Sequence, residues 1–168
     1  MYRQLNDFLE SWKSEAVTTQ KVLDTLTDAS MSQAVTDGHR TLGRIAWHIV
    51  TTIPEMMGNT GLTLEQMLNP ENPVPATAAE IAGAYRGISA ALHRVIEEEW
   101  NDESLEIEDE MYGEKWKRRF TLTALVQHQI HHRGQMTVLM RQAGLRVPSI
   151  YGPAKEDWDE YDMEAPAI

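Results

Sequence analysis

Four long segments in which apolar residues recur every three to four positions are the strongest constraint on what this chain can fold into. Such spacing places one apolar stripe along a helix, and the stripe has to be buried against another element. The segments are residues 3–29, a stretch that follows Gly38 and runs to about Gly58, residues 78–100 and residues 121–143. No comparable run of alternating residues predicts a large sheet, so the chain is expected to be all-α.

The connection between the second and third helical segments is the longest one. A short apolar piece at residues 64–68 stops at Asn69 and Pro70, and the chain stays rich in proline up to Pro75. Thr77 and Glu80 then have the spacing of a capping box that begins the third helix. We therefore predict a four-helix bundle with a long crossover between helices 2 and 3, built as a single domain over residues 1–168.

Two smaller features flank the fourth segment. The sequence at Met111, Tyr112 and Gly113 resembles a turn, which predicts a small hairpin before the last helix. Gly144 is placed to end that helix, with Pro148 beyond it. Residues 145–168 are expected to form an extended tail laid over the bundle.

Composition excludes several classes of function. The chain has a formal net charge of −11, so nucleic-acid binding and binding to anionic lipid are disfavoured. It has no cysteine, which excludes disulfides, cysteine-ligated metals and a thiol nucleophile. No apolar run approaches the roughly 18 residues needed to span a bilayer, and we expect a cytoplasmic protein. Any bound metal has to be held by histidine and carboxylate.

Histidine is where chemistry is expected. The chain has six: His39, His48, His93, His128, His131 and His132. Residues four apart on a helix share one face about 5–6 Å apart, so two imidazoles can converge on one ion. Three of the histidines lie in the last helical segment. On a helical wheel His128 and His132 border the apolar stripe, whereas His131 faces solvent or a partner. His39 and His93 are interpreted as solvent-facing or capping residues.

His48 passes the same wheel test on the second helix, where it borders the apolar stripe. If helices 2 and 4 adjoin, His48, His128 and His132 form a three-histidine site with open positions for water or substrate. An ion held there acts as a Lewis acid, and neutral imidazoles suit zinc, nickel, iron(II) or copper. Glu55, seven residues after His48, is a weaker candidate to accept a proton or support a ligand; the alternative is a solvated carboxylate.

Residues next to the histidines exclude two known classes of metal site. Gln129 stands where a zincin metalloprotease has its glutamate, so that mechanism is excluded. No glutamate precedes any histidine by three residues, which excludes the pairs of di-iron carboxylate bundles. Arg133 falls inside the apolar stripe and is expected to be buried only with an acidic partner; its expected role is structural, with anion binding second.

These segments resemble a known family. Residues 125–136, LVQHQIHHRGQM, resemble the last-helix motif of the DinB family, the damage-inducible proteins of the DinB/YfiT-like metalloenzyme superfamily. Residues 43–49, GRIAWHI, resemble its second-helix motif, and residues 147–153 are in keeping with its tail. The resemblance implies an up-down-down-up bundle, homodimers, and a divalent metal, zinc or nickel before iron or manganese. It assigns His48, His128 and His132 as ligands.

The first functional hypothesis is a metal-dependent enzyme, because some relatives in this superfamily are transferases or isomerases that use small thiols. A thiol-dependent transferase or a hydrolase fits such a site. The alternatives are a non-catalytic metal-binding or stress-response protein and a metal-free interaction module. A vacant metal position beside a pocket favours the enzyme, whereas a closed fourth position favours a structural site.

Overall fold

The computed structural model describes residues 1–64 and 72–167. Four long helices dominate it: α1 (Leu5–Asp24), α2 (Leu42–Gly58), α3 (Ala78–Glu99) and α4 (Arg118–Gln142). Three short 3-10 helices accompany them: η1 (Asp28–Ser32), η2 (Glu103–Glu106) and η3 (Lys155–Tyr161). The predicted all-α, four-helix fold is confirmed. None of the helices in the described ranges is both long and apolar enough to cross a membrane.

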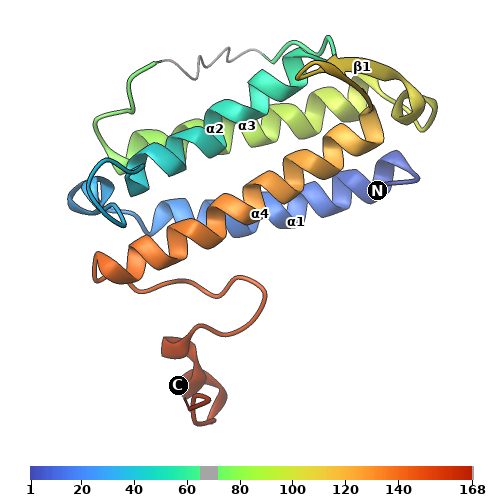
Figure 1. The fold of residues 1–168 in the computed structure, drawn as a ribbon. Helices are drawn as coiled ribbons and strands as arrows, with labels where there is room; N and C mark the ends of the chain where they lie inside the picture. Colours follow the sequence, from blue (N-terminus) through green and yellow to red (C-terminus); the bar gives the residue numbers. More distant parts are fainter. Residues whose placement is uncertain (65–71, 168) are drawn as a thin grey trace.

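The helices form an up-down-down-up bundle, in which α1 and α4 run one way and α2 and α3 the other (Figure 1). Helix α2 packs against α3 and α4, and helix α1 packs against the same two. Fully buried side chains from all four meet in the core: Phe8, Ile53, Leu92 and Leu125. Because α2 and α3 are parallel, the connection between them returns the chain to the other end of the bundle. The predicted apolar piece at 64–68 falls mainly outside the described residues.

Three helix boundaries differ from the predicted ones, and local capping explains the first two. The first helix ends at Asp24 rather than near residue 29, because Thr27 and Ser30 cap each other and begin η1. The second helix starts only at Leu42, where the Thr41 hydroxyl accepts from the Arg44 amide at 3.2 Å. Residues 36–38, which precede His39, therefore do not cap helix α2, and His39 and Arg40 lie in the loop before it. The fourth helix begins three residues before the predicted position.

Other predicted signals are confirmed. Thr77 and Glu80 form the expected capping box at the start of α3. Gly144 follows α4 with a φ of +74°, a conformation that suits glycine. The Leu145 amide then donates to the Met140 carbonyl at 2.9 Å, which satisfies a carbonyl in the last turn of the helix.

The predicted hairpin is present. Strands β1 (Glu108–Met111) and β2 (Glu114–Lys117) pair antiparallel across a two-residue turn at Tyr112 and Gly113, both with positive φ. Arg118 at the start of α4 binds the Asp109 carboxylate at 2.9 Å and donates to the Thr60 carbonyl at 2.9 Å. These bonds attach the hairpin to the end of the bundle.

The tail differs from the extended segment predicted for residues 145–168. Its last part folds into η3, which Figure 1 shows in red, standing off from the four helices. Arg141 binds Glu156 at 2.5 Å and Arg146 binds Asp157 at 2.6 Å, so ion pairs hold η3 near the end of α4. Two acidic residues of η3, Glu156 and Asp157, are therefore the partners of these two arginines.

Candidate metal centre

The three predicted ligands lie together. His48 comes from α2, and His128 and His132 come from consecutive turns of α4. Because α2 packs against α4, one ring nitrogen from each histidine lies within 4.8 Å of the others. Nε2 of His48 and Nε2 of His128 are 3.1 Å apart. The adjacency that the sequence could only assume is therefore present.

This donor set fits a divalent ion. Two nitrogens that each bind a tetrahedral zinc at about 2.0–2.1 Å are roughly 3.3 Å apart, close to the separation between His48 and His128. No aspartate or glutamate of the described residues belongs to the group. The three residues therefore offer three neutral nitrogen ligands. His131 is exposed and outside the group, as the wheel predicts.

Neighbouring side chains orient the rings. Nδ1 of His132 donates to Oε1 of Gln135 at 2.7 Å, which leaves its Nε2 lone pair free for a ligand. Nδ1 of His48 is 3.4 Å from the Thr52 hydroxyl, a long contact. Nδ1 of His128 is buried and has no hydrogen-bond partner among the described residues. Each ring therefore has its Nε2 atom available for a shared ligand.

Electrostatics keeps the rings neutral. Burial, followed by the charge of His132, lowers the pKa of His48 to about 4. Burial and the neighbouring histidines lower the pKa of His128 to about 3, and burial also lowers the pKa of His132. Neutral imidazole is the form that binds metals. At neutral pH the three lone pairs are therefore not occupied by protons.

Glu55 points to the hairpin. Its carboxylate accepts a hydrogen bond from the Tyr112 hydroxyl at 3.0 Å. Burial, and then the Glu55 charge, raises the pKa of Tyr112, so the phenol stays protonated and donates. Glu55 is not part of the histidine group, and its role as a proton acceptor stays a prediction.

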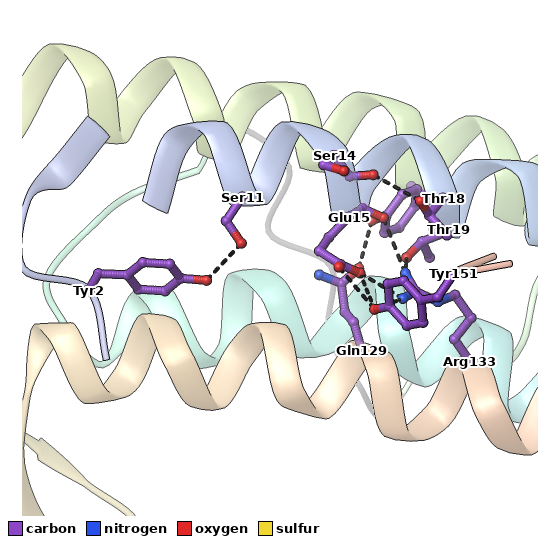
Figure 2. Close-up of polar contacts among 10 residues, drawn as sticks. Tyr2, Ser11, Ser14, Glu15, Thr18, Thr19, Gln129, Arg133 and Tyr151 are labelled. Atoms are coloured by element: carbon purple, nitrogen blue, oxygen red, sulfur yellow. Dashed lines mark hydrogen bonds and ion pairs between the residues drawn. The ribbon is translucent and has the colours of Figure 1, made fainter. Parts of the chain in front are cut away.

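Arg133, the residue after His132, points toward α1, whereas His132 lies beside His48 of α2, and Arg133 is 1% exposed. Figure 2 shows it among side chains of α1 and the tail. It binds the Glu15 carboxylate at 2.6 Å, donates to the Thr19 hydroxyl at 2.9 Å and contacts the Tyr151 hydroxyl. The predicted acidic partner is thus Glu15, and the role of Arg133 in the structure is to join α4, α1 and the tail.

A second buried contact lies one turn earlier on the same face of α4. Gln129 accepts a hydrogen bond from the Tyr85 hydroxyl of α3 at 2.6 Å, and both side chains are fully buried. This hydrogen bond was not predicted from the sequence. The available signal was the spacing of Gln129 and Arg133, two polar residues four apart on one helix face.

Two further residues near the histidines were missed. Gln135 lies three residues after His132, a spacing at which helical side chains meet. Arg40, in the loop before α2, lines a cavity together with His132 and Gln135. No local pattern marks Arg40, because its position depends on how this loop packs against α4. His39 is exposed, with Nδ1 3.1 Å from the Thr36 hydroxyl, and His93 is half-buried, 3.9 Å from Glu97.

Known proteins are similar to this chain in sequence and fold. The DinB family model matches residues 1–164. The uncharacterized protein YrdA of Bacillus subtilis (strain 168) is 47% identical over 168 residues, all of both chains. A DinB-like protein from Bacillus cereus ATCC 10987 has 48% identity and a TM-score of 0.86, covering 90% of this chain and 100% of its own. The DinB-like protein YjoA of B. subtilis, 15% identical with a TM-score of 0.68 over 88% of this chain and 99% of its own, shares the fold. This chain belongs to the DinB family.

Proposed function

We propose that this protein is a divalent-metal-dependent enzyme, a thiol-dependent transferase or a hydrolase, in which His48, His128 and His132 hold the ion. The observation that carries the proposal is the convergence of their ring nitrogens within 4.8 Å, with no carboxylate in the group. When bound, the ion supplies Lewis-acid chemistry for a thiol, a water molecule or a substrate oxygen. Zinc or nickel is the first choice, and iron(II) or manganese the second.

The residues around the ion have separate tasks. Gln135 accepts from Nδ1 of His132 and so holds that ring with its other nitrogen toward the centre. Burial keeps the rings unprotonated at neutral pH. A cavity of about 430 Å³ opens beside His132, which leaves room for a small substrate. This space supports an enzyme over a structural site, because a structural site closes its fourth position with a protein ligand.

Elemental analysis of protein made without a histidine tag tests the proposal. We expect about one divalent ion per chain after reconstitution with zinc or nickel, and loss of the ion in His132→Ala. His131→Ala is the matched control, because it removes an exposed neighbouring imidazole outside the group. Absence of metal after trials with zinc, nickel, iron(II) and manganese would contradict the proposal and favour an interaction module.

Turnover decides between the enzyme and a non-catalytic metal-binding protein. The metal-loaded chain is screened for thiol transfer and for hydrolysis, with His132→Ala as the blank. A bound ion without turnover across both reaction classes favours the metal-binding or stress-response alternative. We also propose a cytoplasmic homodimer, as the family resemblance implies, and light scattering on the eluted protein measures its mass.

A further inference from the structure

The cavity beside the histidine centre has a distinctive lining. It lies between the loop before α2 and the C-terminal half of α4, and its volume of about 430 Å³ suits a small molecule. His132 and Gln135 form the side that faces the metal centre. A ligand in this cavity would therefore reach the edge of the three-histidine group.

The opposite walls are aliphatic. Val35 from the loop and Val138 from α4 both line the cavity and are 61% and 55% exposed. Ile45 and Leu139 line it from beneath and are buried. Single exposed valines are common on protein surfaces, but two that border one cavity offer an apolar contact for a ligand. The cavity thus accepts a molecule with a hydrocarbon body.

The charge in the cavity is positive. Arg40 lines it, is exposed, and makes no ion pair with any carboxylate of the described residues. Arg40 lines the cavity together with His132, so its guanidinium lies beside the histidine group. After burial and the neighbouring histidines, the Arg40 charge also contributes to the lowered pKa of His48 and His128. No aspartate or glutamate is among the described residues that line the cavity.

The metal would add to this charge. A divalent ion held by three neutral imidazoles keeps its full charge, because the described residues contribute no carboxylate to the group. A cationic cavity in a chain of net charge −11 favours an anionic ligand at this place. A single guanidinium with its planar pair of donors suits one carboxylate, whereas a phosphate is usually held by several donors.

We infer that this cavity binds a small carboxylic acid with an apolar body, its carboxylate on Arg40, its hydrocarbon part between Val35 and Val138, and its far end at His132. The inference rests on the proposed function, since it names the substrate class of the same centre. Arg40 is then a specificity-determining residue. The acid is recognised by charge at one end and by apolar contact along its length.

Calorimetric titration of the zinc-reconstituted protein with 4-phenylbutyrate, and with the uncharged 4-phenylbutanamide, tests this inference. We expect the acid to bind about tenfold more tightly than the amide, because a charge-assisted hydrogen bond distinguishes them. Arg40→Gln is expected to remove that preference. Arg3→Gln makes the same charge change just before α1, whose first residue is Leu5, and should leave the preference intact. The N-terminus and the loop before α2 lie at opposite ends of the bundle (Figure 1). Val138→Asp should weaken binding of both probes.

Two results would overturn the inference: equal affinity of acid and amide for the wild-type protein, including no binding of either, or equal effects of Arg40→Gln and Arg3→Gln. The metal content of each sample is measured separately by elemental analysis. Absence of metal from the chain therefore refutes the proposed function. The Arg40-dependent preference for the acid, measured on the same sample, separately tests whether the cavity binds a carboxylic acid.

Discussion

Two consecutive residues of α4, His132 and Arg133, belong to two polar centres of opposite character. The Arg133 centre is closed: its guanidinium is paired with Glu15 and hydrogen-bonded to Thr19, and the tail covers it through Tyr151. The histidine centre is open: three ring nitrogens face one another, and His132 lines a cavity. Buried polar groups nearly always have a hydrogen-bond partner, so three ring nitrogens gathered beside a cavity point to a shared ligand.

The two centres also differ in charge. The Arg133 centre contains its own acid, and burial followed by the Glu15 hydrogen bond raises the pKa of Tyr151, so that its phenol donates. The histidine centre has no acid within its group, so a bound cation is not neutralised there by the described residues. Polar residues on two faces of one helix thus perform two tasks: one face stabilises the bundle and the other is available for chemistry.

The largest change in stability is expected when the closed Arg133 centre loses its acidic partner. Glu15→Ala leaves the Arg133 guanidinium buried without its acid, at a cost of about 3 kcal/mol in the free energy of unfolding. Thermal denaturation should show a Tm lower by roughly 6–12 °C. Glu10→Ala, an exposed glutamate of the same helix, is the control, and an equal drop in both variants would show that the pair contributes nothing.

The second largest change in stability is expected when a zinc ion binds to the open histidine centre. Zinc at about 100 times its dissociation constant should stabilise the wild-type protein by about 2.7 kcal/mol, or roughly 5–11 °C in Tm. The same zinc should not move the Tm of His128→Ala, which lacks one of the three nitrogens. A similar zinc-dependent rise in this variant would mean that the ion binds elsewhere.

A smaller effect is expected from the residue that orients His132. Gln135→Leu removes the acceptor at 2.7 Å and should weaken zinc binding about 10- to 100-fold, measured by competition with a chromophoric chelator. Because Gln135 is exposed, the free energy of unfolding of the metal-free protein should barely change. Gln135→Glu keeps an acceptor and should retain the affinity; if it binds zinc as poorly as Gln135→Leu, the orienting role is refuted.

The smallest effect concerns the tail. Tyr151→Phe removes the hydroxyl that contacts Glu15 and Arg133 and should cost about 1 kcal/mol in urea denaturation. Zinc affinity should stay unchanged, because this contact lies on the other face of α4 from His132. A change in zinc affinity without a change in stability would show that the two centres are coupled.

Much of the candidate site could be predicted because it is local. His128 and His132 share a face through helix geometry alone, and the wheel removes His131 for the same reason. That Arg133 needs an acid follows from the cost of burying an unpaired charge. The identity of that acid could not be predicted, because Glu15 lies 118 positions away and several other carboxylates were equally available.

The helical stripes, the capping box at Thr77, the hairpin turn and the shared face of His128 and His132 could all be predicted, because each depends on contacts within a few residues. The contact of His48 with the other two histidines, the place of Arg40 at the cavity and the Tyr85–Gln129 hydrogen bond became known only from the folded structure. These depend on which helix faces pack together, and that is set by the fit of the whole core rather than by any local pattern.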